Sequence, residues 1–529
     1  SFASDNGSRL ILDITPDSDA CIVSVHTQDN PFSFLLKDVC SEYPMLIKRY
    51  GVVVTNADDA RSYAEIEKAI NGLGLKTKLQ EMELEEEESY DNAAKNTRVM
   101  HSPTWLGLSR DVRIFEFIDS YETGLRINPK YPFVMTTNEG ERGYIPYQFN
   151  VQLGRGASCV ADMRRHNEDG ILPILHGYWR DDEITYNYTV FTSLEYTPLT
   201  AENLMGTDYL ESSALSAGFM KTPEQEDRLK KLEAEKPKDE EQTVFYGRVT
   251  AVNNAKVPRY AWFRAPIPME ITTNTYYTSG IASASEGKYF CAAKFNGSPL
   301  PKDETAILLK PGETASMDFA LPHSQVSKER AEKLLEQDFD LRHEECQKYW
   351  MAKLNKAAGI EVPEKRINEM IHAGLCHVDT SSFGKEPDGP IAVNVGVYAP
   401  IGTESSPIIQ FMDSMGWHNT AERALDFFFD TMHDDGFVQN YGGYELETQA
   451  FLWCAGEHYR YTKDDKWVKR VEPKLLKACE YLRAWRDRNS KEELRGKGYG
   501  MLDGRVADPM DRYRYFMANS YYSLGLSSV

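Results

Sequence analysis

"YELETQAFLWCAGEHYRYTKDD" covers residues 444–465 and carries more aromatic rings than an ordinary surface helix needs. Its last residues, "TKDD" (462–465), are turn formers. A second helical stretch follows them, and then a glycine-rich loop full of acids and arginines. This order predicts two long helices joined by a tight turn. The positions of such helix ends decide which loops share one side of the fold.

The overall composition indicates a large globular protein. The chain has 529 residues, enough for two or three domains with their own cores. Its hydrophobic content of 41% and aromatic content of 12% are typical of well-packed proteins. The formal charge of −21 disfavours nucleic acid and anionic membrane surfaces as partners, because both are polyanions. No stretch approaches the roughly 20 apolar residues that span a bilayer.

The sequence lacks the common signatures of cofactor and metal binding. It contains no HExxH, Walker A, GxGxxG or GxSxG motif, and its eight cysteines lie singly, as free and mostly buried thiols do. His372 and His377 are five residues apart on one predicted helix, which is a poor metal spacing. We therefore expect no cofactor and no metal ion. The chain starts at Ser1 without a methionine, so a signal peptide or a tag has been removed, and we expect a periplasmic or secreted bacterial protein.

The period of the hydrophobic pattern changes near residue 325. Earlier stretches such as "RDVRIFEFID" (110–119) and "EITYNYTVFTSLEYTP" (183–198) are rich in β-branched and aromatic residues. They predict a strand-rich domain over 1–325, with polar helical insertions near 58–92 and 200–242; the charge runs at 58–92 and 222–242 indicate solvated surface. A linker over 326–362 follows, which contains one long amphipathic helix over 326–356.

The remaining residues, 363–529, are predicted to form helical hairpins that begin with Pro363 at a helix start. The expected helices lie at roughly 363–380, 405–416, 418–433, 444–462, 465–488 and 510–527. If they alternate in direction, three long loops share one side, namely 381–404, 434–443 and 489–509. Long loops on one face of a rigid scaffold commonly carry function, and the helix N-termini on this side favour anionic groups.

The three long loops are rich in carboxylates and tyrosines. Carboxylates beside flat rings suit sugar chemistry, because one acid protonates the leaving oxygen, a second activates water or attacks the ring, and rings stack on sugar faces. The candidate catalytic residues are Asp508, Asp511 and Glu404. The candidate substrate-binding residues are Tyr398, Gln439, Asn440, Tyr441, Tyr444, Asp503, Arg505 and Arg512. The alternatives are structural: Asp508 precedes a proline as an N-cap does, and Glu445 and Glu447 suit a helix-dipole role.

Three segments resemble the (α/α)6 toroid glycosidases, the six-hairpin enzymes that include glucoamylases, trehalases, α-L-rhamnosidases and the sugar phosphorylases. The segments are "GIEVPEKRINEMIHAGLCHVD" (359–379), the run from "GWHN" to "WRDR" (416–488) and "GYGMLDGRVADPMDRYRYFMANSYYSLGL" (498–526). In many of these enzymes a β-sandwich precedes the toroid through a linker helix, so the resemblance implies a β-sandwich domain over 1–325. The resemblance implies that residues 444–465 form an inner toroid helix, which is packed on both sides. It also implies an inverting mechanism with a general acid in the third loop, Asp508 first and Asp511 second.

Two features depart from the family pattern. Many toroid glycosidases carry a Trp-x-Arg-Asp-like signature in the first loop, where this chain has "APIGTESSP" (399–407). The toroid has twelve helices, whereas 363–529 supplies the first half of that number, and the second catalytic carboxylate of the resembled enzymes lies in the later half. The chain is therefore either a fragment or a departure from the family.

We accordingly predict an exo-acting, inverting glycoside hydrolase with an oligo- or polysaccharide substrate. The crowding of Arg505, Arg512 and Arg514 in an acidic protein suggests an acidic sugar such as a uronic acid, because arginine forks grip carboxylates. The alternative is that these arginines pair with the acids that alternate with them. Rival functions are a polysaccharide lyase on the same toroid, which uses Tyr with His or Asn on a uronate, and a non-catalytic sugar-binding or scaffold protein.

Overall fold

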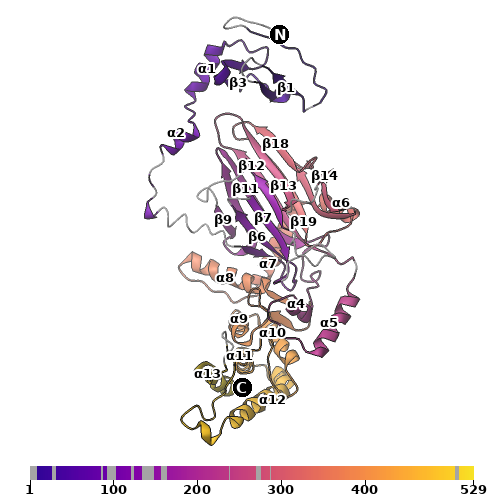
Figure 1. Cartoon of the computed structure of the whole chain (residues 1–529), viewed down its shortest axis with the longest axis vertical. Coiled ribbons are helices and arrows are strands. Elements are labelled where there is room, and N and C mark those ends of the chain that lie inside the picture. Colours follow the sequence, from indigo (N-terminus) through magenta and orange to yellow (C-terminus); the bar gives the residue numbers. More distant parts are fainter. Residues whose placement is uncertain are drawn as a thin grey trace.

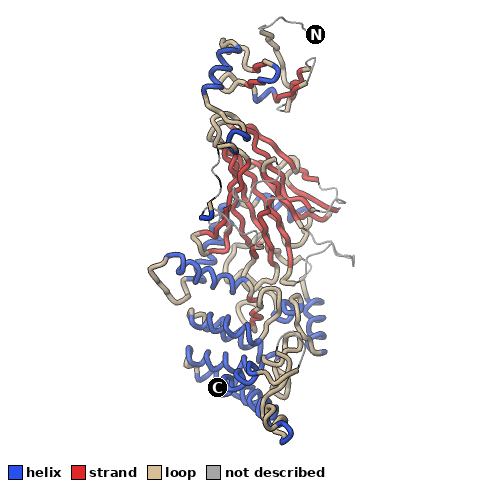
Figure 2. Tube along the Cα trace, turned by 60° about the vertical axis from the view of Figure 1, so that its left-hand side comes forward, coloured by secondary structure: helices blue, strands red, loops and turns tan. Residues whose placement is uncertain are grey.

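The computed structural model is a multidomain β + α protein in which strands dominate up to Pro322 and helices follow (Figures 1 and 2). It describes residues 9–18, 20–26, 31–84, 87, 89–91, 103–120, 124–133, 148–155, 164–237, 239–269, 276–285, 287–506 and 512–529. Among these residues, no helix is both long and apolar enough to cross a bilayer. The described cysteines are all free thiols, and most of them are buried.

Two antiparallel sheets form the strand-rich half of the chain. The larger has the order β14-β15-β16-β19-β12-β11-β10-β9, with β17 paired to β16, and the smaller has the order β18-β13-β8-β7-β6-β5. Strands of the larger sheet are β9 (Arg164–Glu168), β10 (Leu172–Asp181), β11 (Ile184–Leu194), β12 (Thr243–Asn253), β14 (Tyr276–Thr278), β15 (Ile281–Ser285), β16 (Lys288–Phe295), β17 (Ser298–Pro299) and β19 (Thr314–Pro322). Strands of the smaller sheet are β5 (Thr104–Leu106), β6 (Ile114–Ser120), β7 (Gly124–Lys130), β8 (Phe149–Leu153), β13 (Arg259–Pro268) and β18 (Glu304–Leu309).

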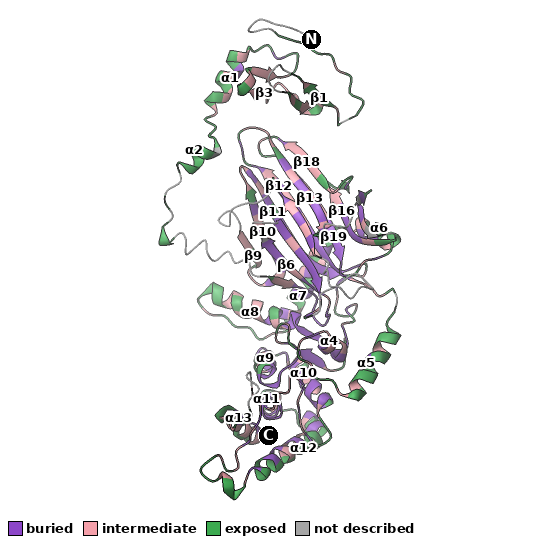
Figure 3. Cartoon of the chain, viewed as in Figure 1, coloured by how far each residue is buried: buried purple, intermediate pink, exposed green. Residues whose placement is uncertain are grey.

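Both faces of the larger sheet are buried. On one face, Trp179 and Phe245 share an apolar cluster with Phe117 of the smaller sheet, so the two sheets pack against each other. On the other face, Phe191 and Tyr246 belong to a second cluster that continues into the helices. Figure 3 shows this burial running along the central strands. Two-sided burial explains why the "EITYNYTVFTSLEYTP" stretch begins by alternating and ends as a continuous buried run.

The strands before residue 100 lie outside the two large sheets (Figure 1). They pair as two small hairpins, β1 (Ile22–Val25) with β2 (Phe32–Leu35) and β3 (Met45–Ile47) with β4 (Val52–Val54). The first predicted insertion contains the helices α1 (Tyr63–Gly72) and α2 (Lys78–Met82), which begin with complete capping boxes at Ser62 and Thr77.

The second predicted insertion, 200–242, is only partly a surface segment. Its charged helix α5 (Pro223–Glu235) is largely exposed, as the charge run predicts. The preceding helix α4 (Tyr209–Ala214), in contrast, buries most of its residues, and the Tyr209 ring packs edge-to-face on Phe427 at 5.6 Å between centroids. The prediction of solvated surface came from the charge run of 222–242, which contains α5; α4 lies before that run, and its apolar side chains belong to the core of the helical half.

The predicted single helix over 326–356 is two helices, α6 (Lys328–Glu336) and α7 (Phe339–Leu354). The break occurs because the Asp338 carboxylate accepts the amide hydrogens of Asp340 and Leu341 and so starts a new helix as its N-cap. The helical spacing within α7 is as predicted, since Cys346, Tyr349 and Trp350 are all buried.

The helices after residue 363 form two layers. Their bounds are α8 (Lys365–Thr380), α9 (Gly402–Ser414), α10 (His418–Thr431), α11 (Glu447–Thr462), α12 (Asp465–Arg488) and α13 (Phe516–Ser528). As predicted, α11 is packed on both sides, by α9 and α13, while α10 and α12 lie against this row. Four starts differ from the prediction: Pro363 lies before α8, α9 begins earlier, α11 begins at Glu447 rather than at 444, and α13 begins at Phe516 rather than near 510. A small hairpin, β20 (Ser382–Gly384) with β21 (Ile391–Val393), was not predicted.

Buried charges join the sheets to the helices. The Arg110 guanidinium, beside the smaller sheet, pairs with Asp379 near the end of α8 at 2.9 Å and with Glu386 at 2.9 Å. Lys353 of α7 also pairs with Asp379, and its ammonium group donates to the Ser109 hydroxyl at 2.6 Å. Removing one partner would leave another charge buried and unpaired. The network therefore fixes the position of the strand-rich half relative to the helical half.

Candidate functional site

The described parts of the long loops, around 394–401, 432–446, 501–506 and 512–515, meet where α9 and α11 begin, as the alternation of helices predicts. We call this meeting point the rim. The Glu445 amide donates to the Arg505 carbonyl at 2.8 Å, which joins the second loop to the third. The Tyr398 and Tyr441 rings touch edge to face at 5.6 Å between centroids, which joins the first loop to the second. The rim therefore assembles side chains that are remote in sequence.

Glu447, the first residue of α11, lies at the centre of the rim and is 0% exposed. Its carboxylate accepts the amide hydrogens of Asn440 at 2.7 Å, Tyr441 at 2.9 Å and Gly402 at 3.2 Å. Burial raises the pKa of Glu447 to about 7, although the amide hydrogen bonds act in the opposite direction. The predicted helix-dipole role is thus incomplete, because this carboxylate binds amides outside its own helix.

The close approach of α9 and α11 depends on glycine at position 402. A Cβ atom there would lie 2.7 Å from the Glu447 Cα atom, which is backbone and cannot rotate away. Glycine therefore lets the first amide of α9 reach the buried carboxylate. The first turn of α9 also carries Glu404, an exposed carboxylate that accepts the hydroxyl hydrogen of Thr403.

Three tyrosines form a row along the rim. Tyr398 is 44% exposed, and it touches Tyr441, which in turn touches Tyr444 at 5.2 Å between ring centroids. The Arg505 guanidinium carbon lies 5.1 Å from the Tyr444 ring centroid, a cation–π contact. The row thus presents partly exposed flat rings next to a cation.

Two arginines of the third loop contact Glu445, one through its backbone and one through its side chain. The Arg505 amide donates to one Glu445 carboxylate oxygen at 2.8 Å, and the Arg512 side chain donates to the other at 2.8 Å. The Arg505 side chain also donates to the Gly442 carbonyl. Arg512 thus forms an ion pair with a carboxylate that the sequence did not single out as a partner, whereas Arg505 reaches the same carboxylate through its backbone amide.

Two other predicted binding residues support the loops themselves. The Gln439 side-chain amide donates to the Tyr444 carbonyl at 3.0 Å, within its own loop. The Asp503 carboxylate accepts the Trp485 indole hydrogen at 3.2 Å and an Asn489 amide hydrogen at 2.6 Å, which anchors the third loop to the end of α12. Burial raises the pKa of Asp503 and these hydrogen bonds lower it, with a net lowering. The two leading catalytic candidates, Asp508 and Asp511, lie outside the described residues.

A fourth segment, residues 217–220, completes the rim and was missed from the sequence. It follows α4 and runs between the first two loops: the Ala217 amide donates to the Val397 carbonyl at 2.8 Å, and the Met220 amide donates to the Asn440 carbonyl at 2.8 Å. Gly218 has a φ of +80°, and a Cβ atom there would lie 2.0 Å from the Tyr441 ring. The "SAGF" stretch (216–219) carries this glycine signal, but its partners Val397 and Tyr441 are far away in the sequence.

The part of the chain that the structure describes contains one group of three possible metal ligands, and it lies away from the rim, at Glu168, His176 and His343. His372, by contrast, makes a local contact, with Nδ1 2.8 Å from the Asn368 carbonyl oxygen.

Comparisons with known proteins give distant structural similarities. No protein-family model matches the chain, and no curated protein matches it. Similar solved structures include a bacterial glucoamylase complexed with acarbose, at 11% identity and a TM-score of 0.39, over 81% of this chain and 66% of that chain. A polysaccharide lyase matches at 10% identity and a TM-score of 0.18, over 73% of this chain and 69% of that chain. A family GH92 α-mannosidase from Bacteroides thetaiotaomicron matches at 8% identity and a TM-score of 0.17, over 72% and 46% of the two chains. This chain thus spans less than two thirds of the glucoamylase and the mannosidase chains.

Proposed function

We propose that the protein is a carbohydrate-active enzyme whose substrate binds at the rim, and that it is a glycoside hydrolase acting on an oligo- or polysaccharide. One observation carries the proposal: the row of Tyr398, Tyr441 and Tyr444 lies beside the carboxylate of Glu445 and the guanidinium of Arg505. Flat rings stack on sugar faces, and polar groups beside them select hydroxyl or carboxylate substituents. The helices that carry the rim are, in this proposal, the first hairpins of an (α/α)6 toroid.

The catalytic roles fall to the exposed or loop carboxylates and not to Glu447, which is too deeply buried to touch a substrate. In the proposal, Asp508 is the general acid, Asp511 is the second choice, and Glu404 is a further active-site carboxylate. Arg505 and Arg512, on either side of the segment 507–511, both contact Glu445. The chain therefore enters and leaves that segment at the rim, which supports a role for its acids there.

The finer parts of the proposal concern mechanism and substrate. We propose exo-action with inversion, in which one carboxylic acid protonates the leaving oxygen and a second carboxylate activates water. An acidic sugar would compete with Glu445 for Arg512, whose side chain is more than half exposed. Hydrolysis of a glucuronide that exceeds hydrolysis of the matching glucoside would support the acidic substrate.

A polysaccharide lyase is the second candidate, and the tyrosine row favours it. A lyase on a uronate uses a tyrosine as acid or base, and Tyr444 lies next to a guanidinium that would hold the substrate carboxylate. The products separate the two reactions, because a lyase forms an unsaturated sugar that absorbs in the near ultraviolet and a hydrolase does not.

The test is a product assay with the full chain on neutral and uronate-containing oligosaccharides, read as new reducing ends and as near-ultraviolet absorbance. If the proposal is right, Asp508→Asn and Glu404→Gln lower turnover, by about 10²–10⁴-fold for the general acid. The matched control is Glu492→Gln, an exposed carboxylate of the same loop that forms a local ion pair with Arg495. Reducing ends that appear without ultraviolet absorbance support the hydrolase. The absence of product with every substrate would overturn the enzyme proposal and leave a binding protein.

A further inference from the structure

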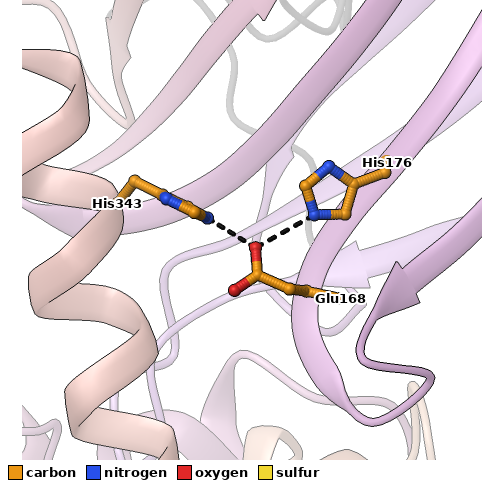
Figure 4. A group of neighbouring side chains, drawn as sticks. All are labelled: Glu168, His176 and His343. Carbon is orange, nitrogen blue, oxygen red and sulfur yellow. Dashed lines mark hydrogen bonds and ion pairs between the residues drawn. The ribbon is translucent and has the colours of Figure 1, made fainter.

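Glu168, His176 and His343 bring three possible metal-ligating atoms within 4.8 Å of one another (Figure 4). The Nε2 atom of His176 lies 3.0 Å from the Glu168 Oε2 atom, and the Nε2 atom of His343 lies 2.5 Å from the same oxygen. Figure 4 shows both imidazole rings pointing at the carboxylate from opposite sides. The three side chains therefore converge on one point although up to 175 residues separate them.

The group lies at the seam between the larger sheet and the helices. Glu168 ends β9, His176 lies in β10, and His343 lies in the second turn of α7. The side chain of Glu168 is 12% exposed and that of His343 is 28% exposed, so the group is sheltered but open on one side to water. An ion bound by these three side chains would link β9 and β10 of the larger sheet to α7.

We propose that Glu168, His176 and His343 form a binding site for a divalent transition-metal ion, with zinc as the best match, at the seam between the sheet and α7. Two imidazole nitrogens and one carboxylate oxygen are a ligand set that zinc accepts, with a water molecule completing four-coordination. Bond lengths near 2.1 Å place tetrahedral ligand atoms about 3.4 Å apart. The observed contacts lie within about 1 Å of that spacing, so small side-chain movements suffice.

Neighbouring side chains already orient the ligands. The Thr189 hydroxyl lies 2.9 Å from His176 Nδ1, and the Gln347 side-chain amide donates to the other Glu168 carboxylate oxygen at 2.8 Å. With the His176 proton on Nδ1 and donated to Thr189, the Nε2 lone pair faces the ion. The Phe191 and Phe339 rings pack beside His343 and limit its movement. Such outer partners typically change metal affinity by about 10–100-fold.

The test is zinc uptake by the full chain. The protein is treated with a chelator, freed of it, and dialysed against micromolar Zn²⁺ in one arm and Ca²⁺ in the other; bound metal is then measured by mass spectrometry. We expect one zinc ion per chain, no stoichiometric calcium, and a zinc-dependent rise in melting temperature. The absence of stoichiometric zinc, or calcium uptake in its place, would overturn the proposal.

Variants locate the ion within the chain. His343→Ala and His176→Ala should lower zinc affinity at least tenfold and abolish the thermal shift, and Thr189→Val should lower it by about 10–100-fold. The matched control, His26→Ala, removes an exposed histidine from the N-terminal hairpin and should bind zinc as the wild type does. Circular dichroism checks that each variant is folded, and His343→Gln replaces His343→Ala if the alanine variant does not fold. Unchanged zinc binding by folded variants of both histidines would overturn the assignment.

Discussion

Glu447 at the rim and Glu168 at the seam both hold remote segments together, but they do so with opposite kinds of partner. Glu447 is fully buried and its carboxylate accepts backbone amide hydrogens, so burial raises its pKa to about 7. Burial also raises the pKa of Glu168, but hydrogen bonds from His176 and His343 outweigh it and lower that pKa to about 2. The two carboxylates differ in burial and in partner: Glu447 is fully enclosed with neutral amide donors, whereas Glu168 is partly exposed and contacts two imidazoles that can carry charge.

The largest effect should follow from removing the Glu447 carboxylate. Glu447→Ala leaves the amides of Gly402, Asn440 and Tyr441 without their acceptor at a buried site, and each unsatisfied donor costs about 1–3 kcal/mol. We therefore expect a loss of about 3–5 kcal/mol in the free energy of unfolding of the helical half, measured by urea denaturation. Glu492→Ala, at an exposed site, should change it by no more than about 0.5 kcal/mol. A loss below about 1 kcal/mol would show that the amides find other acceptors.

The second prediction concerns the pH dependence that Glu447 introduces. Because its folded pKa of about 7 exceeds the ordinary value of 4.5, the folded protein binds more protons than the unfolded chain between these values. Stability therefore falls as the pH rises from about 4.5 to 7 and is then constant, by a total on the order of 3 kcal/mol. Glu447→Gln lacks this titration.

The measurement for this prediction is the stability gap between wild type and Glu447→Gln across that pH range, since other titrating groups cancel in the difference. The free energy of unfolding of the wild type should fall relative to that of Glu447→Gln as the pH rises. A gap that is independent of pH would mean that the amide hydrogen bonds compensate the charge, and the contrast with Glu168 would disappear.

The meeting of the three loops was predictable, but the groups that hold them were not. Helix spacing and turn residues indicate which loops share a side, because successive helices joined by tight turns must reverse direction. The role of Glu447 depends on Gly402 and on Asn440, and local patterns carry no information on such pairings. The break between α6 and α7 is different, because the sequence does contain its signal, the N-cap residue Asp338. The signal was missed because the hydrophobic pattern has a helical period on both sides of Asp338. Glu168, His176 and His343 form no motif, because strand pairing and the packing of α7 bring them together.

The smallest loss of stability should follow from replacing Glu168. This variant tests whether imidazole partners compensate a carboxylate charge better than backbone amides do. In chelator-treated protein, Glu168→Gln removes the negative charge but leaves a side-chain oxygen that accepts one imidazole hydrogen. Because the site is partly exposed, we expect a loss of only about 1 kcal/mol in the free energy of unfolding.

With zinc at 100 times its dissociation constant, the free energy of unfolding of the wild type should rise by about 2.7 kcal/mol. Glu168→Gln should not gain this stability at the same zinc concentration, so the stability difference between the two proteins should increase. The double variant Glu168→Gln with His343→Gln closes a mutant cycle whose coupling energy isolates the carboxylate–imidazole interaction. If Glu168→Gln lowers the free energy of unfolding of the metal-free protein as much as Glu447→Ala does, the imidazoles do not compensate the charge of Glu168, and Glu168 resembles Glu447 in this respect. If zinc does not increase the stability difference between the wild type and Glu168→Gln, Glu168 does not bind zinc. The two imidazoles would then account for the low pKa of Glu168 without an ion.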